Sequence, residues 1–223
     1  MKGLTKLFML LAIAATFAAC SSEPKGEDAK TTDAKEVQEA DAVAATFVVN
    51  EGTVNWEGTK VGGAHTGTIN VTEGSLDVKD GNIVGGKLTI DMNSLVCTDL
   101  AEDQGKAKLE GHLKGPDFFD VEAYPTATFQ VTNATALSND STATHVISGN
   151  LTMKDVTKNV SFKAQVGVAD GNITANTPPF VINRVDWGVK YGSGSLPDVV
   201  KEKAINDNVG LSISLKAAAK TES

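Results

Sequence analysis

Two segments of this chain have glycine and polar residues at spacings close to those of catalytic loops. Residues 81–87 match the glycine and lysine spacing of a phosphate-binding loop, but Leu88 stands where Ser or Thr would be needed, and no helical pattern follows. Residues 192–195, Gly-Ser-Gly-Ser, lack the spacing of a nucleophile elbow and also precede no helix. We therefore expect neither phosphate binding nor serine catalysis from these segments.

Histidine and cysteine offer little more chemistry. The three histidines, His65, His112 and His145, are far apart and the chain has no CxxC motif, so we expect no metal site and no cofactor. Cys97 could be a nucleophile, but a half-buried small residue is the better interpretation. An enzyme stays an alternative to a binding or structural role, and His65 or Asp186 would be its best candidate for catalysis.

The N-terminus has the features of an export signal. Two early lysines give it positive charge, and residues 7–19 form an apolar run too short to cross a bilayer as a helix. Cys20 follows Phe-Ala-Ala, which is similar to a bacterial lipobox although Phe replaces the usual aliphatic residue. We expect residues 1–19 to be a cleaved signal peptide and Cys20 to carry lipid chains that anchor the protein to a membrane.

The remainder of the chain divides into three parts. Residues 20–45 have too few large apolar side chains to fold, so we expect a flexible tether after the lipidated cysteine. Residues 46–217 carry the periodic patterns of one domain, and residues 218–223 are expected to be a disordered tail. The net charge of −8 makes nucleic acid a poor partner. With Cys20 acylated, no intrachain disulfide can form.

Alternation of apolar and polar residues, typical of half-buried strands, dominates the domain. It runs through residues 69–78, 84–92, 127–131, 147–153, 160–168 and 209–215. The parity changes at Gly74, as a β-bulge requires. Asp-Gly-Asn at residues 80–82 and again at 170–172 is a strong hairpin signal. One helical pattern, weakened by two glycines, lies near residues 99–114.

These patterns predict an all-β domain of about eight antiparallel strands with a short helical insertion near 99–114. Eight strands with one apolar face can form either a sandwich or a closed barrel. Many of the strands are long and the chain contains 21 Gly, which favours a barrel with glycine kinks. We therefore predict an eight-stranded antiparallel barrel, a size that can enclose a small ligand.

Residues 112–129 concentrate rare side chains. Three of the 8 Phe, one of the 2 Tyr and two of the 6 Pro lie in this stretch. This composition indicates a fixed corner between the helical segment and a strand, beside something apolar. Phe118 and Phe119 would either close one end of the barrel or fix the helix to it. Further along, Arg184 and Asp186 share one face of a predicted strand, and we favour a structural pair over a contact with ligand.

Four blocks of the domain together resemble the YceI-like family. They are residues 54–60 with 63–67, 109–120 with 124–129, 148–160, and 182–189. The second block, with His-Leu-Lys-Gly-Pro-Asp-Phe-Phe-Asp at 112–120, and the third are the most specific, and the first is similar to the variant in lipoprotein-type members. The chain departs from the family pattern where Glu110-Gly111 replaces the usual Arg-Asp and at Asn159, where Pro is frequent.

The resemblance implies a lipocalin-like barrel whose apolar tunnel holds a polyisoprenoid or another long-chain lipid without catalysis. The candidate tunnel residues, chosen by inward parity and by the aromatic corner, are Leu88, Ile90, Met92, Phe118, Phe119, Phe129, Val131, Leu151, Met153, Phe162, Val166 and Trp187. The alternative is a surface or periplasmic structural or interaction module whose barrel is filled by its own side chains and takes no ligand.

The same resemblance and the lipobox imply an exported bacterial lipoprotein of the cell envelope. It would lie at the periplasmic face of the outer membrane or at the cell surface. Its expected partners are a long-chain lipid or isoprenoid and the membrane itself, reached through Cys20. We leave a homodimer open.

Overall fold

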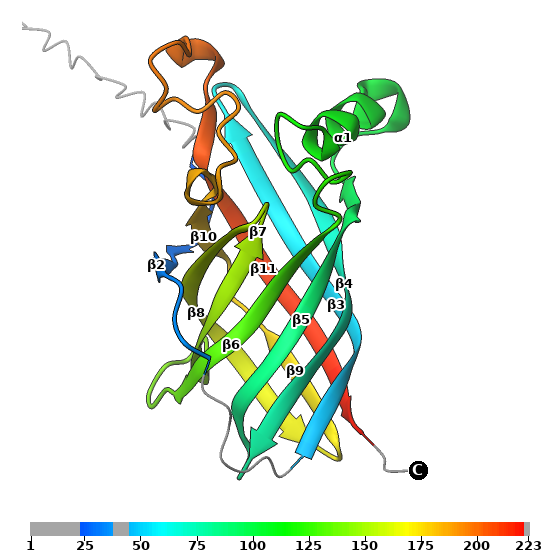
Figure 1. The fold of residues 1–223 in the computed structure, drawn as a ribbon, viewed down its shortest axis with the longest axis vertical. Helices are drawn as coiled ribbons and strands as arrows, with labels where there is room; N and C mark the ends of the chain where they lie inside the picture. The colour runs from blue at the N-terminus through cyan, green and yellow to red at the C-terminus, as the bar shows by residue number, and fades with distance from the viewer. Residues whose placement is uncertain (1–22, 38–44, 221–223) are drawn as a thin grey trace, which may run out of the picture.

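Eight strands close into an antiparallel barrel in the computed structural model, which describes residues 23–37 and 45–220 (Figure 1). The barrel strands are β3 (Ala45–Lys60), β4 (Gly63–Lys79), β5 (Asn82–Cys97), β6 (Thr126–Ala136), β7 (His145–Met153), β8 (Val156–Ala169), β9 (Asn172–Asn176) and β11 (Ile205–Ala219). The short strand β9 pairs with both β8 and β11 and so closes the ring. The predicted eight-stranded antiparallel barrel is confirmed.

The two Asp-Gly-Asn sequences make the hairpins that the sequence predicts. Asp80 and Gly81 have φ values of 51° and 78°, and Asp170 and Gly171 have 51° and 70°. Positive φ at both central residues is the mark of a type I′ turn, whose twist matches that of the flanking strands. These turns join β4 to β5 and β8 to β9, and residues 81–87 therefore run from a turn into a strand.

The change of parity near Gly74 is a β-bulge, as predicted. Val71 and Leu76 are both buried although they differ in parity, and the register between β4 and β5 shifts between Val71 and Glu73. The extra residue lets both halves of a 17-residue strand present apolar side chains to the interior.

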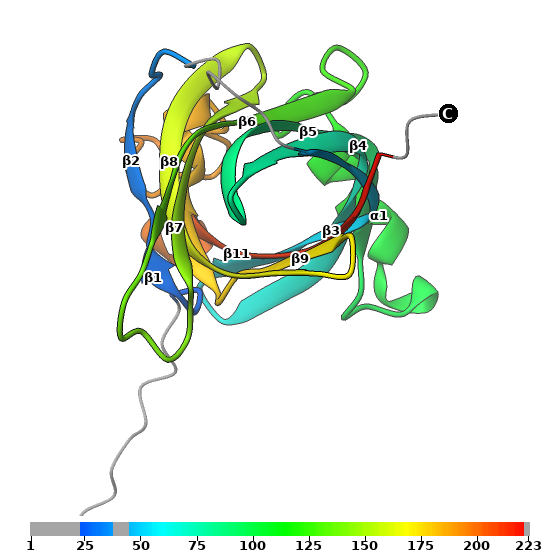
Figure 2. The ribbon, with the colours of Figure 1, turned by 90° about the horizontal axis from the view of Figure 1, so that it is seen from below.

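The helical insertion is also confirmed. It consists of the 3-10 helix η1 (Glu102–Gln104) followed by α1 (Lys106–Lys114), both between β5 and β6. Figure 1 places α1 beside one end of the barrel, which we call the upper end, and Figure 2 shows the ring of strands from the opposite side. No α1 residue is fully buried, but Leu113 packs against the barrel core.

Three further strands extend the sheet beyond the ring. They are β1 (Glu27–Asp28), β2 (Lys30–Asp33) and β10 (Phe180–Asn183); the 3-10 helices η2 (Arg184–Trp187) and η3 (Lys201–Lys203) follow β10. Strand β10 pairs with β11, and β1 lies parallel to β10. Strand β2 pairs with the outer edge of β8. Where β9 leaves edges open, β2 thus covers that of β8 and β10 covers that of β11, and β1 in turn covers the free edge of β10.

The expected flexible tether at residues 20–45 is therefore wrong for residues 23–37. Asn150 binds both backbone groups of Lys35: its Oδ1 accepts the N–H at 3.0 Å and its Nδ2 donates to the carbonyl at 2.7 Å. Lys158 adds an ion pair to Asp33 at 2.9 Å. A polar segment can thus be ordered largely by backbone pairing, with few apolar side chains such as Pro24 and Ala29 packed beneath it. Residues 20–22 and 38–44 lie outside the described residues.

The C-terminal boundary also differs from the prediction of a disordered tail at 218–223. Strand β11 continues to Ala219, which pairs with Phe47, and the Lys220 N–H donates to the Thr46 carbonyl at 2.9 Å. The ladder with β3 satisfies these backbone groups, so the small side chains here do not end the strand. Residues 221–223 lie outside the described part.

Apolar side chains form two packed clusters. The larger fills much of the barrel interior, and the smaller consists of Val160, Phe180, Ile182 and Trp187, contributed by β8, β10 and η2. Among residues 23–37 and 45–220, no helix is both long enough and apolar enough to cross a membrane.

Candidate functional site

The barrel interior contains two adjacent chambers. The lower chamber has a volume of about 100 Å³, and Thr177 is the one polar residue in its wall. The upper chamber has a volume of about 290 Å³, near the lower end of the range for small-molecule sites. The two chambers share five wall residues, which are Val54, Ile90, Leu151, Ile182 and Leu211. The chambers therefore lie end to end along the barrel.

Eleven of the twelve predicted tunnel residues border these chambers. The lower chamber is bordered by Leu88, Ile90, Phe129, Val131, Leu151, Phe162 and Val166. The upper chamber is bordered by Ile90, Met92, Phe118, Phe119, Leu151 and Met153. Inward parity identified the nine that lie on strands, because alternate side chains of a barrel strand point to the interior, and the aromatic corner identified Phe118 and Phe119.

Trp187 is the exception and does not border either chamber. Its side chain is fully buried in the smaller cluster, and its Nε1 donates to the Leu151 carbonyl at 2.9 Å. The prediction assumed that a strand continued through this position. The chain instead turns into the 3-10 helix η2, and the period of two no longer applies.

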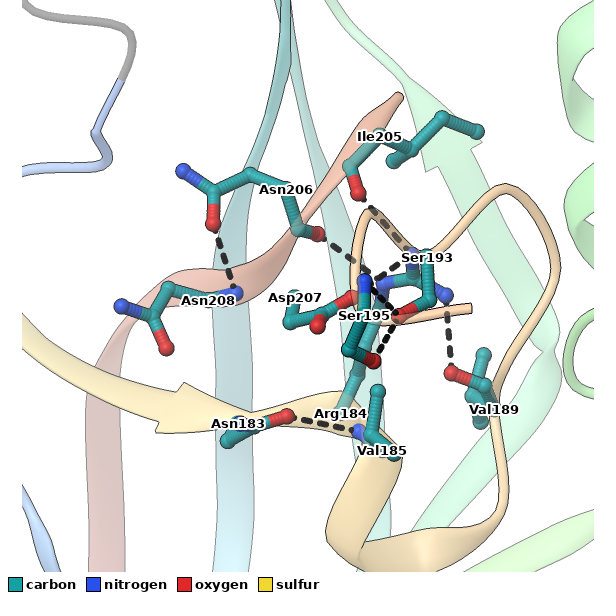
Figure 3. A network of polar contacts seen from close by, with 10 residues as sticks. All are labelled: Asn183, Arg184, Val185, Val189, Ser193, Ser195, Ile205, Asn206, Asp207 and Asn208. Atoms are coloured by element: carbon teal, nitrogen blue, oxygen red, sulfur yellow. Dashed lines mark hydrogen bonds and ion pairs between the residues drawn. The ribbon is translucent and has the colours of Figure 1, made fainter. Parts of the chain in front are cut away.

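The same helix separates Arg184 from Asp186, which the sequence placed on one face. Arg184 is 3% exposed, whereas Asp186 is exposed. The Arg184 guanidinium donates to the carbonyls of Val189, Asn206 and Ile205 at 2.7, 3.0 and 3.2 Å, as Figure 3 shows. Burial lowers the pKa of Arg184, an effect that Asp207, 3.5 Å away, opposes. The guanidinium thus fastens η2 and the following loop to the start of β11.

The wall of the upper chamber contains several polar side chains, which come mostly from the ends of strands β3, β4 and β11. Thr59, Lys60, His65, His112, Arg184 and Asn206 all border it. The lower chamber, in contrast, has the nearly continuous apolar wall described above. A molecule that occupied both chambers would therefore meet apolar surface along most of its length and polar groups at one end.

Phe118 both borders the upper chamber and fixes the corner after α1. Its ring lies 5.1 Å from that of His112 and 5.3 Å from that of Tyr191, and the Arg184 guanidinium lies 5.8 Å from its centre. Lys154 Nζ donates to the Phe118 carbonyl at 2.6 Å. These contacts support the role of fixing the corner after α1; closing the barrel end stays a prediction for Phe118.

Trp56 is one of the residues of the upper chamber that sequence reasoning missed. Its indole lies across Gly67 of the neighbouring strand, where a Cβ would overlap the ring. Its Nε1 is buried and has no hydrogen-bond partner within the described chain. Because a buried donor without a partner is costly, this group is a candidate for contact with a ligand. The sequence offered one signal for this residue: Trp56 lies near Gly58 in the first block that resembles the family.

His65, Cys97 and Asp99 meet at the upper end beside this chamber. His65 Nδ1 lies 2.9 Å from Asp99 Oδ2, and Cys97 Sγ donates to Asp99 Oδ1 at 3.1 Å. Cys97 is 1% exposed, more deeply buried than the half-buried residue expected. Burial raises the pKa of its thiol, and so does the bond to Asp99. The thiol bonds the carboxylate and not the imidazole, which is unlike a nucleophile paired with its base.

Burial of Asp99 by itself would raise its pKa. The Thr66 N–H, His65 and Cys97 all donate to the carboxylate and outweigh burial, so the pKa falls to about 2. Asp99 is therefore a carboxylate anion at neutral pH. Of the two residues named in the enzyme hypothesis, His65 borders the chamber, whereas Asp186 is exposed outside it.

A closed eight-stranded antiparallel barrel with an apolar interior and a polar mouth is the class of protein that this geometry defines. The family model of the YceI-like domain matches residues 33–217, so the chain belongs to that family. It is 37% identical over 102 residues to a UPF0312 protein of Pseudomonas aeruginosa, which is 45% of this chain and 48% of the relative. A UPF0312 protein of Pseudomonas paraeruginosa is 37% identical over 108 residues, 48% of this chain and 50% of that one. The chain thus spans about half the length of the curated relatives it matches.

Solved structures have the same fold at low identity. BcnA of Burkholderia cenocepacia is 20% identical with a TM-score of 0.58, over 75% of this chain and 96% of BcnA. A polyisoprenoid binding domain from Saccharophagus degradans, implicated in plant cell wall breakdown, is 16% identical with a TM-score of 0.55, over 80% of this chain and all of that one. At these identities the similarity concerns the fold.

Proposed function

We propose that this protein is a non-catalytic binding protein that holds a polyisoprenoid or another long-chain lipid inside the barrel. The observation that carries the proposal is the pair of adjacent chambers, of about 100 and 290 Å³, with an almost wholly apolar inner part. An empty cavity costs a protein roughly 24 cal/mol per Å³. A barrel with a purely structural role would be expected to fill this space with side chains.

The apolar part of the ligand would occupy the lower chamber. Each buried CH₂ contributes about 0.8 kcal/mol, which loss of chain and rigid-body freedom partly offsets. One solved structure with this fold is a polyisoprenoid binding domain, which supports a long hydrocarbon chain as the apolar part of the ligand. The ligand has to pass the five residues shared by both chambers, and Ile90 is one of them.

The polar end of the ligand would lie in the upper chamber and accept a hydrogen bond from Trp56. The Trp56 Nε1 donor has no partner within the described residues, and the chamber that Trp56 borders is also bordered by Lys60 and His65. An oxygen-bearing head group, such as a hydroxyl or carbonyl, would satisfy this donor. No step of the proposal requires a bond to be made or broken.

We also propose that the mature protein is a lipoprotein held close to a membrane of the cell envelope. Cys20 lies three residues before Glu23, a span of at most about 10 Å. Asn208 Nδ2 donates to Glu23 Oε2 at 3.3 Å, and the Lys25 N–H donates to Glu57 Oε2 at 3.2 Å, so the segment is docked on the barrel from there onward. Asn208 is two residues from Asn206, which borders the upper chamber. Acyl chains on Cys20 would therefore hold the polar mouth near the bilayer.

The lipid proposal is tested by titrating delipidated full-length protein with a prenyl alcohol and with a saturated alcohol of equal carbon number. Ile90→Trp places an indole in the wall shared by both chambers, and we expect at least about tenfold weaker binding. Val48→Trp is the matched control, because Val48 is 46% exposed on the same barrel. Equal affinity in both variants, or no binding by the wild type, would support the alternative of a filled barrel.

The anchor is tested separately. Cys20→Ser should release the protein from membranes and remove its acyl label, whereas Ser22→Ala should leave both unchanged. A Cys20→Ser protein that stays in the membrane fraction would contradict the lipoprotein proposal and leave the lipid-binding proposal intact.

A further inference from the structure

Three side chains with different donor atoms converge at the upper end of the barrel. His65 belongs to β4, Cys97 ends β5, and Asp99 follows two residues later. One imidazole nitrogen, the thiol sulfur and one carboxylate oxygen all lie within 4.8 Å of one another. Sequence spacing hid this cluster because His65 is 32 positions from Cys97 and is brought to it by strand pairing.

The backbone fixes the cluster before any ion binds. Gly67 pairs with Cys97, and the Thr98 N–H continues the ladder by donating to the Thr66 carbonyl at 2.9 Å. This pairing places His65 beside Asp99, whose Oδ1 accepts the Thr66 N–H at 2.8 Å. The three donor atoms therefore need little backbone movement to approach one another.

A second carboxylate supports the cluster from the helix. Glu110 in α1 accepts the Cys97 N–H at 2.8 Å through its Oε1. Outer groups of this kind orient metal ligands and are a regular part of metal sites. The cluster is thus held from three elements: β4, β5 and α1.

The donor set selects one class of cation. A thiolate disfavours Ca²⁺ and Mg²⁺, which prefer oxygen ligands, while imidazole, thiolate and carboxylate together suit Zn²⁺ and similar borderline ions. Zinc sites with three protein ligands keep a fourth position for water or another molecule. The donor atoms lie within 4.8 Å of one another, and to coordinate an ion each of them would move to about 2.0–2.3 Å from it.

We propose that His65, Cys97 and Asp99 form a binding site for Zn²⁺ or a similar divalent transition-metal ion at the mouth of the upper chamber. Since His65 also borders the chamber, an ion here lies beside the polar end of any molecule held inside. The site does not depend on lipid binding, and its failure would leave the proposed function untouched. On binding, the thiol gives its proton to solvent.

The competing interpretation is a His65–Asp99 ion pair next to a buried structural thiol. In that case the three groups would bind no metal with significant affinity, and Cys97 would matter only for packing. The two interpretations differ in whether sulfur becomes a ligand, which a spectroscopic probe detects directly.

The test is a Co²⁺ titration of the full-length protein under reducing conditions, monitored by thiolate-to-cobalt charge-transfer absorption. We expect one equivalent of Co²⁺ to produce the band and Zn²⁺ to displace it. Cys20→Ser removes the other cysteine and should leave the band unchanged, whereas Cys97→Ser should abolish it. Absence of the band in the wild type, or its persistence in Cys97→Ser, would overturn the proposal.

Cys97 is almost fully buried, so its replacement could disturb folding. His65→Gln and Asp99→Asn give a second test, because these side chains are 30% and 31% exposed. Each should fold, as judged by circular dichroism, and bind Co²⁺ at least about tenfold more weakly. Folded variants that bind as tightly as the wild type would equally exclude the site.

Discussion

The indole ring of Trp56 lies across Gly67 on the neighbouring strand, and this pairing shapes the wall of the upper chamber. A Cβ at Gly67 would overlap both the ring and the Val96 carbonyl oxygen. The glycine therefore allows a large side chain to lie flat against the barrel. The hydrogen-bond donor of that side chain has no partner within the described residues, and this is the basis for proposing that it bonds the ligand.

Replacing Gly67 with Ala should destabilise the barrel. The added methyl group has to displace the Trp56 ring and also move the backbone away from the Val96 carbonyl oxygen, and overpacking of this kind costs about 1–3 kcal/mol. Urea unfolding measures the change. Gly58→Ala is the control: nothing lies within 4 Å of the Cβ it would add, so its free energy of unfolding should change by less than about 1 kcal/mol. Equal effects at the two positions would contradict the packing described.

Trp56→Phe should weaken ligand binding without weakening the fold. The variant loses one hydrogen bond to the ligand, worth about 0.5–1.5 kcal/mol, or roughly a 2- to 12-fold loss of affinity. The ligand-free protein should be as stable as the wild type or more stable, because an unpartnered buried donor is removed.

Trp187→Phe is the natural comparison for that variant. It breaks the bond to the Leu151 carbonyl and should lower the free energy of unfolding by about 1–3 kcal/mol, with a smaller effect on affinity. Calorimetric titration and urea unfolding of both variants distinguish the two tryptophans. The same loss of affinity in both would remove Trp56 from the head-group site.

Asn150→Ala should release the N-terminal segment from the barrel. The side chain makes two hydrogen bonds to the backbone of Lys35, and it also accepts one from Asn159. Without it, trypsin should cut at Lys30 and Lys35 roughly tenfold faster or more, since local opening requires less free energy. Asn133→Ala, an exposed change on β6, should leave the rate unchanged. Mass spectrometry of the fragments gives the rates, and equal rates would contradict the docking of this segment.

Asp140 should contribute to the acid sensitivity of the protein. The Thr142 hydroxyl, the Thr142 N–H and the Lys163 ammonium hold its pKa well below the ordinary value of 3.8. Because the folded-state pKa is lowered, the contribution to stability is present above about pH 4 and is lost as the pH falls toward the folded-state value. Between about pH 5 and pH 2, Asp140→Asn should therefore lose less free energy of unfolding than the wild type. Asp103→Asn, at an exposed position, should behave like the wild type.

Much of the barrel could be predicted from the sequence because two local signals agree along most strands. Alternating side chains identify the inward face, and Asp-Gly-Asn turns fix the register of two hairpins. Nine strand residues predicted to line the tunnel border a chamber for this reason, and the aromatic corner adds Phe118 and Phe119. The signal fails where the regular structure ends: Arg184 and Trp187 lie in a 3-10 helix, where parity does not predict direction.

Two features depended on information that a local pattern does not carry. The docking of residues 23–37 depends on backbone groups at the edges of β8 and β10 and on Asn150, all distant in sequence. The cluster of His65, Cys97 and Asp99 depends on the pairing of β4 with β5, and no motif spacing marks it. Both arise from strand pairing, which has to be known before the contacts can be inferred.

The central claim, that the barrel holds a long-chain lipid, is tested most directly by native mass spectrometry of the gently purified full-length protein. We predict a non-covalent adduct with the mass of a prenyl or acyl lipid, released on collisional activation and reduced in Ile90→Trp. The account would be contradicted if the purified protein showed no adduct and also took up neither prenyl nor acyl chains when these were added.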